Sequence, residues 1–347
     1  MDLKEDICHI FLHTENVWQK FANKTIFISG GTGFFGKWIL HCFIHANDVL
    51  KLNIKVIVLS RNFELFIQKN PVFKHTSINY IENDVRDFVF PKEAIDFIIH
   101  AATNAGIAFN VEHPLPMFDT IVEGTRRILE LAKAKKVASL LYVSSGAVYG
   151  KQPSEVKKLN EDYIGSPDIS GAGSAYAEGK RVAEMMCHMY FREHQVHSKI
   201  VRCFAFVGPY LPLHADFAIG NFISDIVAGN TINIKGDGTS IRSYLYASDL
   251  MVWLFNAFIF GKTCRPYNVG SDQDLSIKEL AQLIASCSEK SNIEIKVAKQ
   301  DGTIIPSRYV PCIDRARDEL GLKVNIGLKD AIYKTIIQNK YHANTQL

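Results

Sequence analysis

Residues 25–40, TIFISGGTGFFGKWIL, decide the fold of this chain. The short apolar run at 25–28 predicts a buried strand, and an apolar-periodic helix follows the glycines. Between them, Gly30, Gly33 and Gly36 have the spacing GxxGxxG. One glycine allows the tight turn, one lets backbone approach a pyrophosphate, and one lets helix and strand pack closely. The phosphates would lie on the free N–H groups at the helix start, where the helix dipole favours anions. The stretch therefore predicts a nucleotide site rather than an ordinary strand–turn–helix connection.

The composition is that of a water-soluble globular protein. The 347 residues are 47% hydrophobic and 22% charged, which suits about two domains, or one large domain with a lobe. The net charge of +3 is too small to argue for nucleic acid, and no apolar run reaches the roughly 20 residues that a membrane span needs. No signal-peptide pattern opens the chain, and its seven cysteines are scattered without a CxxC pair. These features predict a cytoplasmic protein with reduced cysteines, no metal site, and no nucleic-acid or membrane partner.

Strands and helices alternate after the glycine turn, which predicts a parallel sheet with right-handed crossovers. The further expected strands are 54–59, 78–81, 97–100, 140–143, 200–204 and 232–234; the expected helices are 116–135, 174–193, 216–228, 248–260, 276–285 and 328–339. The fold class expected is α/β: a doubly wound Rossmann sheet with a smaller α/β substrate-binding lobe. Its expected parts are a helical arm at 1–23, a nucleotide domain at 24–204 to which 236–270 returns, and a lobe made of 205–235 and 271–347.

The residues after the second strand predict which cofactor binds. An NAD site places a carboxylate there to accept from the ribose 2′-hydroxyl. This chain has Ser60 and Arg61 at that point and no acid. A hydroxyl and a cation suit the 2′-phosphate of NADP better, so NADP is favoured over NAD. The alternative is that Arg61 is a solvated loop residue.

The ends of the next two strands predict the rest of the cofactor site. Asp84 is expected to accept from the adenine amino group and Val85 to contact the ring, although Asp84 could equally be a turn carboxylate. Ala101 and Ala102 follow the strand at 97–100 and are small enough for a dinucleotide to lie against their backbone. Thr103 comes next and is assigned to the substrate.

Tyr176 and Lys180 lie four residues apart in SAYAEGKRVAE, residues 174–184, and so share one face of the expected helix. A tyrosine with its ordinary pKa of about 10 is a poor base at neutral pH, and a lysine ammonium one turn away favours the phenolate. Ser145, at the end of the fifth strand, could bridge a substrate oxygen and the tyrosine. A lone YxxxK also occurs by chance on surface helices. Behind a glycine turn, however, this trio predicts proton transfer coupled to hydride exchange with a nicotinamide.

With these motifs the chain resembles the extended short-chain dehydrogenases/reductases of the NAD-dependent epimerase/dehydratase family, which act on nucleotide-diphosphate sugars. The resemblance runs from about Lys24 to Thr335. The resemblance is based on the motifs GGTGFFG at 30–36, NDVRD at 83–87, HAAT at 100–103, SSGAVYG at 144–150, YAEGKRVAE at 176–184, GDGTSIRSYLYASDL at 236–250 and YNVGS at 267–271. The sequences of 176–184 and 236–250 are most similar to those of the UDP-glucuronate decarboxylase branch.

The resemblance implies a role for further residues. The family's catalytic residues fall on Ser145, Tyr176 and Lys180, and its diphosphate-binding arginine falls on Arg242, with a second one on Arg308. It places Asn221 at the substrate and adds Phe34 and Phe35 to the glycine turn as cofactor contacts. It also implies a nucleotide-diphosphate sugar as substrate and a homodimer formed by the helices at 116–135 and 174–193. The alternative for Arg242 is a buried ion pair with Asp249.

Gly146 and Ala147 depart from the family pattern. Dehydratases carry an Asp-Glu pair there, and the decarboxylases carry a glutamate at the position of Ala147. Ala205 and Ile121 also replace two asparagines of the family. Elimination across C5–C6 needs an acid and a base, so a 4,6-dehydratase is not expected.

Redox chemistry at a sugar C4 needs only the trio and the nicotinamide, so we expect an NAD(P)-dependent 4-epimerase or 4-ketoreductase. A decarboxylase is the alternative reaction, because a β-keto acid is itself labile. Outside the enzymes, the alternative is an NAD(P)-binding scaffold or sensor, but such a protein would be free to lose the trio.

Overall fold

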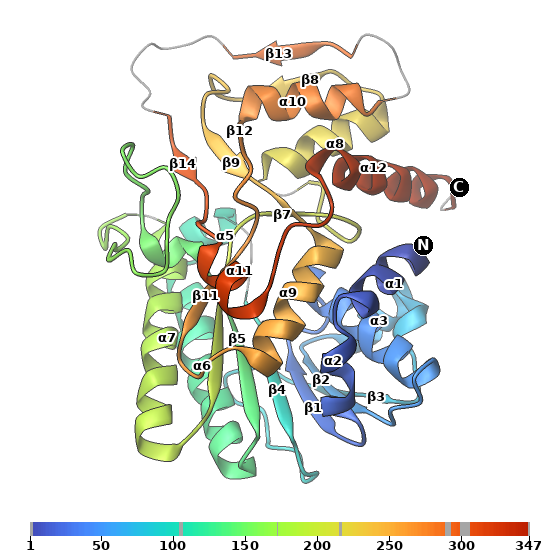
Figure 1. Cartoon of the computed structure of the whole chain (residues 1–347), viewed down its shortest axis with the longest axis vertical. Coiled ribbons are helices and arrows are strands. Elements are labelled where there is room, and N and C mark those ends of the chain that lie inside the picture. Colours follow the sequence, from blue (N-terminus) through green and yellow to red (C-terminus); the bar gives the residue numbers. More distant parts are fainter. Residues whose placement is uncertain are drawn as a thin grey trace.

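The structure is a computed structural model that describes residues 3–103, 107–171, 173–214, 217–288, 293–298 and 306–345. Within these residues, seven parallel strands form the central sheet in the order β11-β6-β5-β4-β1-β2-β3 (Figure 1). They are β1 (Thr25–Ser29), β2 (Lys55–Ser60), β3 (Ile78–Glu82), β4 (Phe97–His100), β5 (Ser139–Ser145), β6 (Ser198–Cys203) and β11 (Pro266–Val269). The order reverses between β1 and β4. At such a point the carboxyl ends of the strands open a crevice for ligands.

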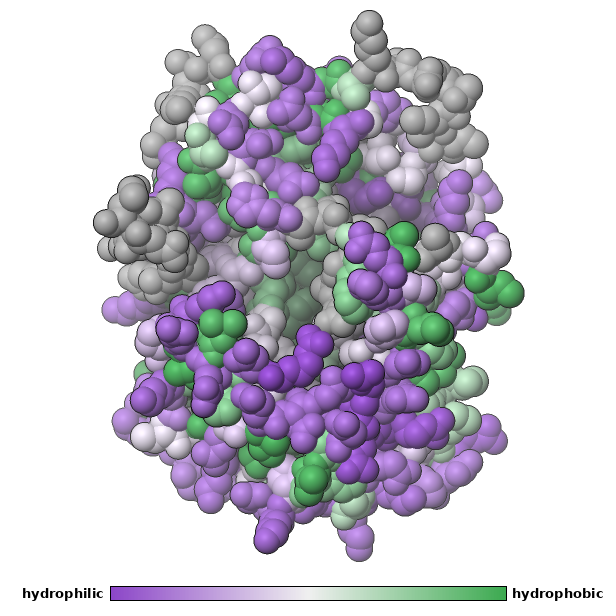
Figure 2. All heavy atoms as spheres, turned by 180° about the vertical axis from the view of Figure 1, so that it is seen from behind, coloured by the Kyte–Doolittle hydropathy of each residue, from purple (hydrophilic) through white to green (hydrophobic). Residues whose placement is uncertain are grey.

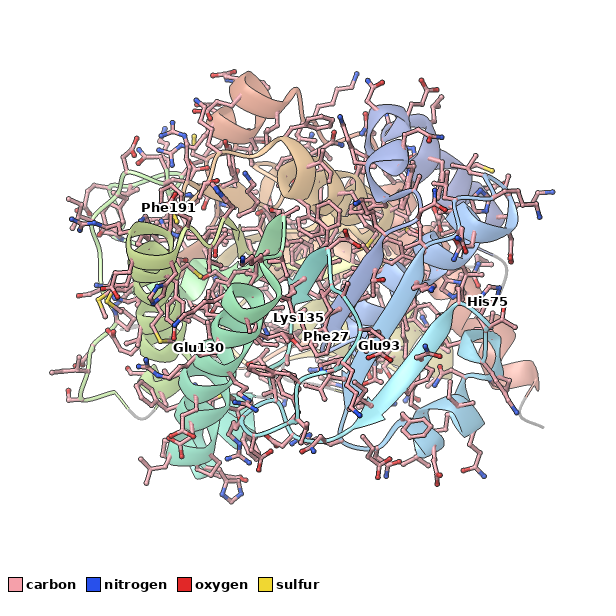
Figure 3. All side chains as sticks on the ribbon, turned by 90° about the horizontal axis from the view of Figure 1, so that it is seen from below. Phe27, His75, Glu93, Glu130, Lys135 and Phe191 are labelled. Atoms are coloured by element: carbon pink, nitrogen blue, oxygen red, sulfur yellow. The ribbon has the colours of Figure 1, made fainter. Side chains whose placement is uncertain are left out.

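Helices cover both faces of the sheet because both faces are apolar. Alternate strand residues point to opposite faces. In β1, Ile26 and Ile28 pack in one core with α3 (Phe34–Asp48) and α9 (Ala247–Phe260). Phe27 packs in the other core with α6 (Pro114–Lys135) and α7 (Ser174–His194). Figure 3 labels Phe27 on the sheet, Glu130 and Lys135 on α6, and Phe191 on α7. The doubly wound α/β fold is therefore confirmed.

A smaller lobe lies at the carboxyl ends of the strands (Figure 1). Its own apolar core is formed by α8 (Ala218–Ala228), α10 (Ile277–Ser286) and α12 (Leu328–Thr345), with β8 (Ile232–Ile234) paired to β13 (Ile295–Val297). Between the lobe and the main sheet, β9 (Ile241–Ser243) pairs with β12 (Asp274–Ser276) and with β14 (Arg308–Tyr309). Seen from behind, the surface is hollowed between the lobe and the sheet layer, and apolar residues line the floor of the hollow (Figure 2).

The other elements are shorter or connect these layers. They are α1 (Lys4–Leu12), α2 (Glu15–Trp18), α4 (Phe63–Lys69), α5 (Ile107–Glu112), β7 (Phe206–Val207), β10 (Leu245–Tyr246) and α11 (Asp314–Leu320). None of the helices within the described ranges combines the length and apolar character that crossing a bilayer requires.

The N-terminal arm packs into the core of the molecule. Asp6 accepts a hydrogen bond from the Tyr246 hydroxyl at 2.8 Å, and His9 Nε2 lies 2.9 Å from Asp249 Oδ1. The buried Asp249 carboxylate also accepts from the backbone N–H groups of Asn325 and Ile326. Asp249, the alternative partner for Arg242, thus holds the arm and the segment before α12.

Most predicted boundaries lie within a few residues of those observed. β5 runs on to Ser145, two residues beyond the predicted end at 143, and the serine is the last residue of the strand. The helix expected from 216 begins at Ala218, with Asp216 outside the described residues. Ser276 caps α10 in a capping box with Glu279, whose carboxylate accepts from the Ser276 N–H at 2.7 Å. The seventh strand, β11, was not predicted as a strand.

Candidate active site

The glycine turn closes against the end of β4. Gly30 has a φ of +79°, and a Cβ there would lie 2.6 Å from backbone atoms of Ala101 and Ala102. At Gly36 a Cβ would lie 2.2 Å from the backbone of Gly31, so the helix start needs a glycine to pack on the turn. At Gly33, the N-cap of α3, the nearest non-neighbouring atom to a Cβ would be Gly30 O, 3.6 Å away. The helix start is thus open on the side where a pyrophosphate would bind, which fits a dinucleotide.

Phe34 and Phe35 begin α3, with their rings edge to face at 5.7 Å. The Phe35 ring also meets Phe206 edge to face at 5.4 Å, and both phenylalanines pack on the core under α3. These two predicted cofactor contacts therefore also anchor the helix start to the sheet.

The ends of β2 and β3 bring Arg61 and Asp84 to one edge of the crevice. Ser60 is the buried last residue of β2, and the exposed Arg61 follows it. Asp84 Oδ1 accepts from Arg86 Nε at 2.8 Å and from the Arg86 N–H at 3.0 Å. Burial works against ionisation of Asp84, but these hydrogen bonds and the charges of Arg86 and Arg61 bring its pKa below the ordinary value. Val85 is buried, and a Cβ on Gly124 of α6 would lie 2.8 Å from its side chain.

Ser145, Tyr176 and Lys180 come together at the carboxyl end of β5. Lys180 is 2% exposed, donates from Nζ to the Val143 carbonyl at 2.7 Å, and lies 5.8 Å from the centre of the Tyr176 ring. Ser145 Oγ accepts from the Ala147 N–H at 3.1 Å. Burial raises the pKa of Tyr176, and hydrogen bonding to Ser145 opposes that rise. Burial also lowers the pKa of Lys180 to about 8, so the ammonium that supports a phenolate persists only up to mildly alkaline pH.

Asn110 of α5 fixes the start of α7 and was not predicted from the sequence. Its Oδ1 accepts from the Tyr176 N–H at 3.0 Å, and its Nδ2 donates to the Gly173 carbonyl at 2.5 Å. The amide is buried, so it holds the turn that carries Tyr176. Asn110 belongs to no motif, and its segment lies between a predicted strand and a predicted helix.

A second tyrosine reaches the trio from the lobe. A Cβ on Gly146 would lie 2.6 Å from the Tyr309 hydroxyl and 2.7 Å from the Phe204 ring. The Tyr309 ring packs on Phe204 with 4.6 Å between centres. Burial raises the pKa of Tyr309, and hydrogen bonding to Ser145 opposes that rise. Tyr309 and Phe204 therefore fill the space that a side chain at 146 would need, which explains the glycine there.

The two predicted phosphate-binding arginines, Arg242 on β9 and Arg308 on β14, point to opposite faces of the small sheet β12-β9-β14. Tyr309 is the register partner of Arg242 in the parallel pair β14–β9, so both point to one face of this sheet. The half-buried Arg242 donates to the carbonyl and hydroxyl oxygens of Ser307 at 3.1 and 3.0 Å. Arg308 points to the other face and forms an ion pair with Asp274. The structure thus brings Arg242, and not Arg308, to the side of Tyr309.

The two remaining substrate candidates, Thr103 and Asn221, lie on other elements than Ser145, Tyr176 and Lys180. Thr103 is partly buried just beyond β4 and directly follows Ala102. Asn221 is partly buried near the start of α8, in the lobe.

Comparison with known proteins identifies the family of this chain. Residues 26–270 match the model of the NAD dependent epimerase/dehydratase family. UDP-glucuronic acid decarboxylase 1 of Danio rerio is 32% identical over 319 residues, which cover 90% of this chain and 72% of that protein.

Two solved structures share the fold. UDP-glucose 4-epimerase of Thermotoga maritima, solved with UDP-glucose, has a TM-score of 0.77 at 19% identity and covers 92% of this chain and 99% of its own. dTDP-glucose 4,6-dehydratase of Bacillus anthracis, solved with NAD, has a TM-score of 0.76 at 20% identity, over 93% of this chain and 98% of its own. The family model and the decarboxylase relative go further than the fold: this chain belongs to the NAD-dependent epimerase/dehydratase family of nucleotide-sugar enzymes.

Proposed function

We propose that the protein performs redox chemistry at C4 of a nucleotide-diphosphate sugar, as a 4-epimerase or a 4-ketoreductase. The observation that carries the proposal is the meeting of Ser145, Tyr176 and Lys180 beside Gly146 and Ala147. A bound nicotinamide would supply the hydride acceptor or donor. Tyr176, supported by the Lys180 charge, would take the proton from the C4 hydroxyl during oxidation and return it during reduction. Ser145 would hydrogen-bond the same sugar oxygen. Gly146 and Ala147 carry neither acid nor base, which disfavours elimination.

The proposal assigns the remaining candidates to the two ligands. The cofactor would lie on Gly30, Gly33, Phe34, Phe35, Gly36, Ser60, Arg61, Asp84, Val85, Ala101, Ala102, Tyr176 and Lys180. The sugar nucleotide would lie on Thr103, Ser145, Asn221 and Arg242, with Arg308 as the second arginine. Arg242 is the better supported of the two arginines, because Ser307 orients its planar fork of donors on the side that faces Tyr309.

Decarboxylation of a nucleotide-diphosphate uronic acid is the second candidate, and the Danio rerio relative favours it. Oxidation at C4 places a ketone β to the C6 carboxylate. The bond to the carboxylate carbon then breaks, CO₂ leaves, and its electron pair forms an enolate with the C4 ketone. Protonation at C5 and return of the hydride to C4 complete the reaction. Ala147 offers no carboxylate to assist, so this route would depend on the lability of the β-keto acid.

The test is incubation with UDP-glucose, UDP-N-acetylglucosamine, UDP-glucuronate, dTDP-glucose, CDP-glucose and GDP-mannose, each with NAD or NADPH, and with a nucleotide-diphosphate 4-keto-6-deoxy sugar and NADPH. Products are identified by mass and by NMR. An isomer of unchanged mass supports the epimerase, and NADPH consumption with a 4-keto sugar supports the reductase. Loss of CO₂ from UDP-glucuronate supports the second candidate instead. A 4-keto-6-deoxy product would contradict the proposal, because it requires an acid and a base that this site lacks.

We also propose that the cofactor is NADP(H) rather than NAD(H), because Arg61 stands where an acid would accept from the ribose. The nearby Asp84 carboxylate is already neutralised by Arg86, so it does not oppose a 2′-phosphate strongly. Arg61→Ala should weaken NADPH binding about tenfold or more and leave NADH binding unchanged. Calorimetric titration measures both, with Lys69→Ala, an exposed lysine at the end of α4, as the control. Equal affinity of the unmutated protein for the two cofactors would contradict the assignment.

A homodimer through α6 and α7 is the expected assembly. The two helices pack side by side, and the Tyr190 hydroxyl of α7 donates to Glu130 of α6 at 2.5 Å. Met185 and Met189 of α7 are 54% and 40% exposed, which leaves apolar surface for a partner helix. Sedimentation at micromolar concentration should give twice the mass of the chain, and Met185→Lys with Met189→Lys should give the monomer. A monomeric parent protein is the contrary result.

We also propose a cytoplasmic location, because the seven cysteines are scattered along the sequence without a CxxC pair. In a reducing compartment they would remain thiols. When the purified protein is unfolded without reductant, a thiol-reactive dye should label seven groups. A smaller number would indicate a disulfide and count against this location.

A further inference from the structure

We propose that Tyr142, a buried tyrosine of β5, is a positioning residue: the face of its ring holds the Lys180 ammonium beside Tyr176. The inference rests on the proposed function only for the task of the ammonium, which is to support the Tyr176 phenolate. Its test measures the charge of Lys180 in the protein without sugar, so the result does not depend on which sugar the enzyme takes.

Strand alternation places the Tyr142 ring beneath α7. In β5, Leu141 and Val143 belong to the core under α3 and α9, whereas Tyr142 belongs to the core under α6 and α7. Tyr142 is 1% exposed, and Lys180 Nζ lies over its ring, 5.1 Å from the ring centre. The face of an aromatic ring is negative and attracts a cation that lies within about 6 Å of the ring centre. The Tyr142 ring is thus close enough to hold the ammonium.

Tyr142 is kept in place by His100 of β4. The two residues are register partners in the β4–β5 pair, and their rings lie 5.6 Å apart between centres. The His100 ring nitrogens hydrogen-bond to the hydroxyl groups of Ser29 at 2.6 Å and Thr125 at 3.0 Å. These contacts run from β1 through β4 to α6. The tyrosine ring therefore rests against a residue that is itself fixed on two sides.

Lys180 has few other contacts that stabilise its charge. Its Nζ donates to the Val143 carbonyl at 2.7 Å and lies 5.8 Å from the centre of the Tyr176 ring. In the part of the chain that the structure describes, no carboxylate forms an ion pair with it. Burial of an unpaired ammonium favours the loss of its proton. The carbonyl and the two ring faces oppose that loss, and a cation is attracted to a ring more strongly where water is excluded.

The titratable groups that face Lys180 come from four elements. They are His100 on β4, Tyr142 on β5, Cys203 on β6, and Tyr176 and Glu184 on α7. Burial lowers the pKa of His100 to about 3 and raises the pKa of both tyrosines and of the thiol, so these groups are neutral near pH 7. Glu184 is paired with Arg202 at 2.7 Å. Replacing Tyr142 leaves the other four groups in the chain, so a change in the charge of Lys180 reports the loss of the ring.

The experiment is an NMR titration of the lysine Cε carbons in purified protein that contains neither sugar nor cofactor. The Lys180 signal is the one that is missing from a Lys180→Met protein. Its midpoint in the parent should lie near pH 8, because burial lowers the pKa of Lys180 to about 8. Tyr142→Leu removes the ring and should lower the midpoint by about one pH unit more, a tenfold loss in the ratio of ammonium to amine.

Three comparisons separate the ring face from a general loss of packing. Tyr142→Phe keeps the ring, and the hydroxyl that it removes has no hydrogen-bond partner among the described residues, so the midpoint should stay in place. Phe27→Leu removes a ring from the same core, one that stacks on Phe88 instead, and should also leave the midpoint unchanged. Trifluorophenylalanine incorporated at position 142 keeps the shape of phenylalanine but makes the ring face less negative. It should lower the midpoint by about half a pH unit relative to Tyr142→Phe.

Three results overturn the proposal: an unmoved midpoint in Tyr142→Leu, a midpoint in Tyr142→Phe as low as that in Tyr142→Leu, or equal midpoints for phenylalanine and trifluorophenylalanine at position 142. If Tyr142→Leu does not fold, the last pair decides, because these two proteins differ only in the fluorine atoms. Failure of every sugar to react would instead count against the proposed function and leave this titration unchanged.

Discussion

Tyr176→Phe is expected to lower turnover by about a thousandfold and to leave cofactor affinity and the free energy of unfolding nearly unchanged. The variant loses one oxygen and keeps a ring that is partly buried in the core under α7. Without the Tyr176 hydroxyl, the proposed site has no base to accept the proton of the C4 hydroxyl as the hydride leaves C4. General acid–base catalysis is worth about 10² to 10⁴ in rate, so the loss falls within that range. NMR of the sugar product follows the reaction, and chemical denaturation follows stability.

The outcome tests the assignment of Tyr176 as the acid and base. Tyr333→Phe, which changes a tyrosine that is 51% exposed on α12, is the control and should react as the parent does. A loss smaller than tenfold in Tyr176→Phe would mean that another group takes the proton, contrary to the assignment.

The sheet could be predicted from the sequence because its signals are local. Each strand of a parallel sheet is covered on both faces, so β1, β2 and β4 are continuous apolar runs. The spacing of Gly30, Gly33 and Gly36 then identified the first crossover, and the right-handed crossover rule ordered its neighbours. Tyr176 and Lys180 could be paired for the same reason, since four residues on one helix meet whatever the rest of the chain does.

Tyr309 and Asn110 could not be predicted, because long-range contacts place them. β14 is two residues long, too short to show the alternation of apolar and polar residues by which a strand is recognised. The sequence therefore could not tell which of Arg308 and Tyr309 faces the site. The pairing of β14 with β9 decides it: Tyr309 turns to the side of Arg242, and Arg308 turns to Asp274. Asn110 likewise gains its role only when α5 comes to rest against the first turn of α7. The absence of a side chain at Gly146 was visible in the sequence, but its cause, the Tyr309 phenol, was not.

Lys180→Met is expected to remove activity and to stabilise the fold. Activity should fall by about a hundredfold or more, because the positive charge that supports the Tyr176 phenolate is gone. The stability gain comes from burial. Lys180 is 2% exposed, and its pKa is lowered from 10.5 to about 8, which corresponds to a penalty of about 3 kcal/mol. Losing the hydrogen bond to the Val143 carbonyl costs about 1 kcal/mol. The net gain at pH 7 is therefore about 2 kcal/mol.

The pH dependence of that gain identifies its cause. A buried lysine with a lowered pKa destabilises the fold fully where both folded and unfolded chains carry the charge, below about pH 8. The penalty shrinks as the pH rises from about 8 toward the ordinary value of 10.5, because the folded protein has already lost the proton. The advantage of Lys180→Met over the parent should thus be largest near pH 7 and small near pH 10, as measured by urea unfolding at both values. Lys151→Met, at an exposed lysine, should show neither the gain nor the loss of activity. Two results would contradict this: a Lys180→Met protein that is less stable than the parent at pH 7, or one whose gain in stability is the same at both pH values. Either would show that Lys180 is not held as a buried charge. A group other than Lys180 would then have to stabilise the Tyr176 phenolate.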